Sequence, residues 1–278
     1  MLQLNRILFP TDFSDNAENA LSFALELASQ TGAAITLFHV IEAPSYIPHD
    51  SGGLPKSHSQ KARTLLEKTA DSIRKSERYS ELQVDLVLQN GNVVSSILEH
   101  ANSKDFDLVV MGTKGRSKMN RILYGSIASH VILESSIPVL AIPENSTQAT
   151  FDPMTFATDF RSGDWAALKQ TIEWADTFNA DLNVLHVAAD RDMQTEIKFR
   201  GFRDLVREKT GNRDRPIQFD IVIQKEFLAG VADYLTDHRM GLLVLVRYKK
   251  KRIEALLKKD HTKELSYYTK VPLLVLNE

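Results

Sequence analysis

The residues with the clearest chemical meaning are glycines and a serine within one stretch of the chain. The apolar run Leu108–Met111 is followed by GTKGRSKMNRILYGS. Gly112 and Gly115 come directly after the run, where the lack of a side chain lets an anion approach main-chain N–H groups. Gly125 and Ser126 open the next amphipathic stretch, and the first N–H groups of a helix there could hold a phosphate. An ordinary glycine turn followed by a helix cap would use the same residues.

Cationic side chains lie within the same stretch. Lys114, Arg116 and Lys118 place positive charge beside the N–H groups that would receive an anion. The order of residues differs from the GxxxxGK[ST] pattern of a Walker A loop. The stretch therefore predicts a phosphate site of another kind.

Short apolar runs alternate with amphipathic stretches in the first half of the chain. The runs, expected as strands, are residues 7–9, 35–40, 84–88, 108–111 and 139–142. The expected helices are residues 62–78, 93–101 and 127–133, and a first helix capped by Ser14 or Asp15 and stopped by Gly32. This alternation predicts a parallel, doubly wound sheet with helices on both faces. Ligands bind such sheets beyond the carboxyl ends of the strands, which directs attention to residues 10–12, 40 and 111–115.

The chain contains an internal repeat. Residues 9–40 align with residues 156–187 at a constant offset of 147, and 11 of the 32 positions are identical. The final apolar runs, IPVLAIP and VPLLVLN, match at an offset of 134. We therefore predict an α/β protein of two tandem doubly wound, Rossmann-like domains, residues 1–145 and 150–278, each with a five-stranded, mainly parallel sheet. The polar stretch PENSTQAT would link them. His39 and His186 end equivalent strands, where we expect both to be packed and hydrogen-bonded.

The first half resembles the universal stress protein family. Glycine, two residues, glycine, nine residues, glycine and serine is the spacing of that family's ATP-binding signature. FPTDFS at residues 9–14 resembles its first strand-to-helix turn, His39-Val40 the end of its second strand, and IPVL at residues 137–140 its last strand. The resemblance covers the whole first half and, more weakly, the second, and tandem chains are a known form of the family.

The resemblance implies a site for ATP, with or without Mg²⁺, in the first half alone. Asp12 would bond to the ribose or adenine, and the backbone of Val40 would contact the adenine edge. Gly115, Gly125 and Ser126 would take the phosphates. The full set of implied binding residues is Pro10, Thr11, Asp12, Val40, Met111, Gly112, Lys114, Gly115, Arg116, Gly125, Ser126, Ile127 and Ala128.

Two of these positions leave alternatives open. The family often has histidine where Lys114 stands, and lysine keeps a cation there but removes an acid–base group. Asp12 could instead cap the following helix or form an Asx turn before Ser14. We assign no catalytic residue and no metal ligand.

The second half is expected to have lost the site. At the offset of 134, Gly112, Gly115, Gly125 and Ser126 correspond to Val246, Lys249, Lys259 and Asp260. Side chains there block the approach of a phosphate, and Asp260 would repel it. Asp159, the counterpart of Asp12, is then expected to act as a helix cap. The basic residues 247–259 could bind an anionic partner, but a solvated helix face is the favoured interpretation.

Composition limits the remaining functions. A net charge of −2 gives no reason to expect nucleic acid or an anionic membrane as a partner, and the lack of cysteine excludes disulfides and thiolate metal sites. The expected protein is a cytoplasmic, nucleotide-binding regulatory or stress-response module with slow or no catalysis. The alternatives are a slow ATPase or an adenylyl-transferring enzyme on the same fold, and a scaffold. The apolar last strands predict that the halves pair as an intramolecular pseudo-dimer; chains could also form a homodimer, and the protein partner is not identified.

Overall fold

The computed structural model describes residues 2–42, 56–103, 105–114, 125–146, 149–211, 213–248 and 270–277. These residues form two compact units: the first comprises the described residues from Gln3 to Glu144, and the second comprises Leu2 and the described residues from Asn145 onward.

The N-terminal unit contains a parallel five-stranded sheet. Its strands are β1 (Arg6–Pro10), β2 (Ala34–Ile41), β3 (Val84–Asn90), β4 (Leu108–Gly112) and β5 (Val139–Ile142). They lie in the order β3-β2-β1-β4-β5, and every neighbouring pair is parallel. The chain first builds outward from β1 through β2 to β3 and then in the other direction through β4 to β5. The strand order therefore reverses between β1 and β4, where a ligand site is expected in this fold class.

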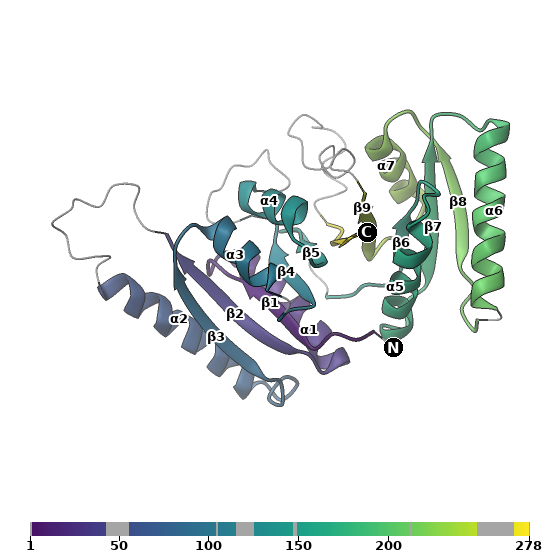
Figure 1. The fold of residues 1–278 in the computed structure, drawn as a ribbon. Helices are drawn as coiled ribbons and strands as arrows, with labels where there is room; N and C mark the ends of the chain where they lie inside the picture. Colours follow the sequence, from purple (N-terminus) through teal and green to yellow (C-terminus); the bar gives the residue numbers. More distant parts are fainter. Residues whose placement is uncertain are drawn as a thin grey trace. The chain divides into compact units, whose positions relative to one another are not determined.

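Four helices cover the two faces of this sheet. They are α1 (Asp15–Thr31), α2 (Lys56–Lys75), α3 (Val93–Asn102) and α4 (Ser126–Glu134). Helices α1 and α2 lie on one face, and α3 and α4 pack together on the other (Figure 1). Helix α1 has the predicted caps: Ser14 Oγ accepts from the Ala17 N–H at 3.3 Å, and Gly32 has a left-handed φ of 76°. Helix α2 begins earlier than predicted, because its polar first turns carry no apolar periodicity.

The C-terminal unit repeats this strand order. Its strands are β6 (Met154–Ala157), β7 (Leu182–Ala188), β8 (Gln218–Ile223), β9 (Leu242–Arg247) and β10 (Leu273–Asn277). They lie in the order β10-β9-β6-β7-β8, all parallel. The helices of its described part are α5 (Asp164–Thr177), α6 (Met193–Thr210) and α7 (Phe227–Asp237). The predicted fold class, two doubly wound α/β domains, is confirmed.

The apolar runs are strands because both faces of each sheet are covered. Every residue of β4, β5 and β6 is buried. The edge strand β3 is more exposed, with a single buried residue, Val84. Among the helices of the described segments, none combines the length and apolar character needed to cross a membrane.

Candidate functional site

The turn after β1 holds Thr11 and Asp12 in a fixed conformation. Thr11 Oγ1 accepts from the Phe13 N–H at 3.0 Å, and Asp12 Oδ1 accepts from the Ser14 N–H at 3.1 Å. Phe13 adopts a φ of 59°, which is unusual for a residue with a side chain. Its ring lies 4.6 Å from that of His39, whose Nδ1 is 2.7 Å from the Thr11 carbonyl oxygen. One oxygen of Asp12 therefore has the Asx-turn role considered above.

The C-terminal unit contains the same turn. Thr158 Oγ1 accepts from the Phe160 N–H at 2.9 Å, and Phe160 also has a φ of 59°. The ring of His186 lies 4.2 Å from Phe160, and its Nδ1 is 2.8 Å from the Thr158 carbonyl oxygen. The prediction that His39 and His186 are hydrogen-bonded is confirmed. Because both units contain this turn, it is a feature of the fold and does not by itself distinguish a ligand site.

A residue that the sequence analysis did not select, Asn16, lies at the start of the glycine-rich stretch. A Cβ added at Gly112 would lie 2.9 Å from Asn16 Nδ2 and 3.1 Å from its main-chain oxygen. The same Nδ2 donates to the Lys114 carbonyl oxygen at 2.9 Å. Asn16 is only 6% exposed. Gly112 is therefore required for α1 to approach β4, and Asn16 fixes the backbone where the loop begins.

Helix α4 places its N-terminus beside the end of β4. The Gly125 N–H donates to the Thr113 carbonyl oxygen at 2.6 Å, so it is already used within the protein. Gly125 supplies no side-chain cap. The N–H groups of Ser126, Ile127 and Ala128 belong to the first helical turn, where no acceptor exists within the helix. These N–H groups and the exposed Ser126 side chain remain as the means of holding an anion.

The positive charge at the site is paired with a carboxylate. Lys114 Nζ lies 2.9 Å from Glu144 Oε2. The predicted ligands Gly115 and Arg116, together with Lys118, lie outside the described residues. The structure therefore brings together Lys114, Gly125 and the first turn of α4, through the contacts of Thr113 and Asn16.

The corresponding edge of the C-terminal unit is built differently. Val246 lies in β9 in place of Gly112, and Gly163 stands at the offset of 147 from Asn16. A Cβ added at Gly163 would lie 2.7 Å from Tyr248 Oη, so the tyrosine ring occupies the space beside this glycine. The Arg161 guanidinium carbon lies 5.2 Å from the centre of that ring. Lys249, Lys259, Asp260 and most of the basic residues 247–259 lie outside the described part of the chain.

The expectation that Asp159 caps a helix is wrong. Helix α5 begins at Asp164 and its N-cap residue is Gly163, so Asp159 does not occupy the capping position. Asp164 is 1% exposed, and its Oδ2 accepts from Thr158 Oγ1 at 2.6 Å, from the Arg161 N–H at 2.9 Å and from the Asp159 N–H at 3.1 Å. Asp164 therefore organises this turn, while Asp159 lies 3.7 Å from the Arg161 guanidinium. The N-terminal unit has Ala17 at the position of Asp164.

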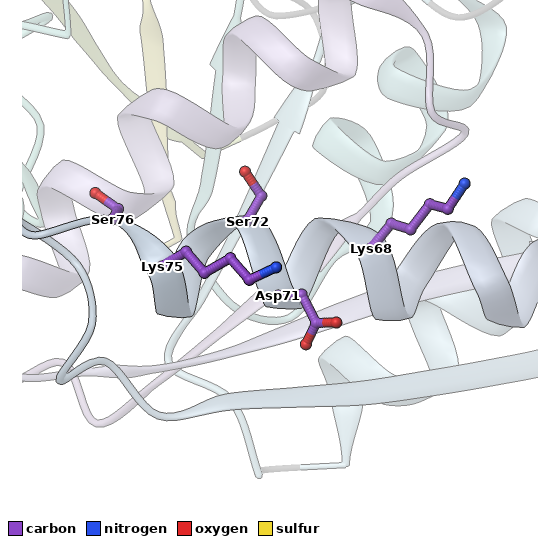
Figure 2. A pocket seen from close by; sticks show the side chains of 5 residues that line it. All are labelled: Lys68, Asp71, Ser72, Lys75 and Ser76. Atoms are coloured by element: carbon purple, nitrogen blue, oxygen red, sulfur yellow. The ribbon is translucent and has the colours of Figure 1, made fainter.

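Within the described residues, neither a surface hollow nor the acidic and histidine side chains offer a further candidate site. A shallow hollow of about 440 Å³ on α2 is lined by Lys68, Asp71, Ser72, Lys75 and Ser76 (Figure 2). All five lining residues come from α2 and its end, and the described part of the chain adds no residue of a second element to the lining. Within the described residues, no three His, Asp or Glu side chains are grouped so that they could hold a metal ion.

A displaced pKa in the C-terminal unit also has a structural cause. Burial raises the pKa of Tyr234, and the nearby Asp220 carboxylate raises it further. Tyr234 Oη donates to Asp220 Oδ2 at 3.0 Å, and its ring stacks on His238 at 4.1 Å. This cluster joins α7 to the edge strand β8. It does not involve the turn after β6 or the end of β9, the elements that correspond to the candidate site.

The sequence model of the universal stress protein family matches residues 3–143, about half of the chain. The matched segment spans β1 through β5. The chain belongs to the universal stress protein family. Universal stress protein MJ0531 of Methanocaldococcus jannaschii is 30% identical over 142 residues, which cover 49% of this chain and 81% of that relative. Stress response protein NhaX of Bacillus subtilis is 28% identical over 170 residues, covering 51% of this chain and 99% of that relative.

A solved structure extends the likeness to the whole chain. A universal stress protein from Archaeoglobus fulgidus matches with a TM-score of 0.75 and 18% identity over 98% of both chains. At this level of identity the likeness establishes the fold, and it covers both units of this universal stress protein.

Proposed function

We propose that this universal stress protein binds ATP in its N-terminal unit alone and acts as a nucleotide-responsive regulatory protein. The observation that carries the proposal is the start of α4, where Gly125 donates to the Thr113 carbonyl oxygen at 2.6 Å and lies next to the backbone of Lys114. A helix N-terminus next to a cation suits a phosphate. The family resemblance and the position of the strand-order reversal support the same edge of the sheet.

The residues present fit a nucleotide. Asn16 Oδ1 and Thr113 Oγ1 are buried polar atoms with no hydrogen-bond partner among the described residues. Both lie where the glycine-rich stretch begins, and such atoms are uncommon in folded proteins unless a ligand or water satisfies them. Asp12 and Val40, from the ends of β1 and β2, are the proposed contacts for the nucleoside.

The structure of the C-terminal unit supports the proposal that the chain has one nucleotide site, in the N-terminal unit. Its equivalent edge carries the Tyr248 ring beside Gly163, a valine in place of Gly112 and the Asp164 carboxylate in the first turn. The tyrosine ring takes up space that a nucleotide would need, and the negative charge of the carboxylate would repel the phosphates.

The direct test is to purify the protein, denature it and identify any released nucleotide by chromatography and mass spectrometry. We expect an adenine nucleotide in an amount no greater than one per chain. If only other compounds are released, or if added ATP, AMP and cyclic AMP all fail to bind the emptied protein, the proposed function is wrong.

We expect ATP hydrolysis to be very slow. Lys114 carries a positive charge paired with Glu144, and Asp12 is engaged in its turn, so neither offers a ready general base. Turnover should stay below about one per minute, against about ten per second for a median enzyme. Release of phosphate measured by a coupled assay checks this. Faster turnover that is lost on replacing Ser126 would favour the alternative of an ATPase.

Pairing of the two halves as a pseudo-dimer, a homodimer of chains and a cytoplasmic location stay predictions. For the pairing, residues 1–147 expressed alone should form a homodimer at tens of micromolar concentration, because the apolar last strand would otherwise be uncovered. Light scattering that gives a soluble monomer would contradict it.

A further inference from the structure

The register of two strands places Lys114 and Glu144 side by side. Strands β4 and β5 are parallel neighbours with Gly112 opposite Ile142, and the Thr113 N–H donates to the Ile142 carbonyl oxygen at 3.0 Å. Lys114 lies two residues after Gly112, and Glu144 lies two residues after Ile142. The register therefore brings the two residues close enough for the contact of 2.9 Å between their side chains.

Helix α1 holds the backbone on both sides of this ion pair. Asn16 Nδ2 donates to the Lys114 carbonyl oxygen at 2.9 Å. One helical turn later, Asn19 Nδ2 donates to the carbonyl oxygen of Pro143, the residue before Glu144, at 3.3 Å. With both backbones fixed, only the side chains of Lys114 and Glu144 have to move to separate the pair. Lys114 is 22% exposed in its side chain and Glu144 is 55% exposed, so Glu144 has the greater freedom to leave.

We propose that Glu144 competes with the phosphates of a bound nucleotide for Lys114. Glu144 thereby lowers the affinity of the N-terminal unit for the nucleotide. The inference rests on the proposed ATP site. A phosphate that reaches Lys114 takes the place of the Glu144 carboxylate, because two anions at one ammonium group repel each other. Binding then costs the protein an ion pair that it already has.

Glu144 lies at the boundary between the two units. Glu144 is the last residue of the N-terminal unit, and Asn145 begins the C-terminal unit. Two residues beyond Glu144, Ser146 Oγ donates to the Lys270 carbonyl oxygen at 2.7 Å within the C-terminal unit. Because Asn19 holds the backbone before Glu144 and Ser146 holds it after, displacement by phosphate moves the Glu144 side chain and leaves the start of the connection in place.

The test compares ATP affinity in four full-length variants by calorimetry at 0.15 M salt, a concentration chosen for the assay. Glu144→Gln should bind ATP about fivefold more tightly, since an exposed ion pair contributes up to about 1 kcal/mol. Lys114→Met should bind more weakly, and adding Glu144→Gln to it should give no further gain. Glu134→Gln, at the exposed end of α4, makes the same change in net charge and should leave affinity within a factor of about 1.5.

Three results would overturn the inference while leaving the proposed function intact. They are unchanged affinity in Glu144→Gln, an equal gain in Glu134→Gln, and a gain that persists when Lys114 is methionine. A wild-type protein that binds no ATP would instead refute the proposed function. Circular dichroism and thermal unfolding of each variant confirm that the affinities are measured on folded protein.

Discussion

Replacing Ser126 with proline is expected to weaken ATP binding by about two orders of magnitude or more and to leave the fold intact. Ser126 is the first residue of α4, a position where proline fits because its missing N–H has no partner in the helix. Gly125 has φ −58° and ψ 162°, the extended conformation that proline requires of the preceding residue. The substitution removes one N–H and one hydroxyl group, and hydrogen bonds to a charged group contribute about 1.5–3 kcal/mol each.

Two control variants separate the backbone from the side chain. Ser126→Ala removes only the hydroxyl group and should lose about half of that binding free energy. Met193→Pro makes the same backbone change at the first residue of α6, where Asp192 has φ −73° and ψ 173°, and ATP binding should not change. Calorimetric titration measures all three. If Ser126→Pro binds as tightly as wild type, the N–H groups of α4 do not hold the phosphates.

Asp164→Ala is expected to destabilise the C-terminal unit by about 2–4 kcal/mol without reducing the affinity for ATP. The buried carboxylate accepts three hydrogen bonds, and its removal leaves the Thr158 hydroxyl and the N–H groups of Asp159 and Arg161 without that acceptor. Leaving buried donors unsatisfied costs about 1–3 kcal/mol each, part of which water recovers. Urea unfolding, followed by the fluorescence of Trp165 and Trp174 in α5, measures the loss.

The matched control is Asp214→Ala, which removes an exposed carboxylate from the same unit. Its stability should change by less than about 0.5 kcal/mol. A stable Asp164→Ala protein would show that this carboxylate does not organise the turn. Loss of ATP binding in a folded Asp164→Ala protein would contradict the assignment of the site to the N-terminal unit.

The sheet could be predicted from sequence because both of its faces are buried. Under that condition each strand is a short apolar run, and the helices between the runs begin and end at residues with known capping preferences, such as Ser14 and Gly32. The internal repeat then fixed the division into two halves. Helix α2 shows the limit, since its polar first turns at Lys56 carry no pattern that marks a start.

The contacts within the candidate site depend on relations that the sequence does not display. Asn16 is a polar residue on the buried face of α1, in the helical pattern that also contains Ala20 and Ala24, and this mismatch was the one available signal. The pairing of Lys114 with Glu144 requires the register of β4 and β5, which is set in three dimensions. Likewise, the repeat identified Asp159 as the counterpart of Asp12 but could not show that a different carboxylate would organise the second turn.

Calorimetric titration of the nucleotide-free protein with ATP measures the number of nucleotide sites per chain. We expect a single binding event in the N-terminal unit, with one ATP per chain, which Ser126→Pro weakens by about two orders of magnitude or more. Two sites per chain, no binding at all, or a single site unaffected by Ser126→Pro would contradict this expectation.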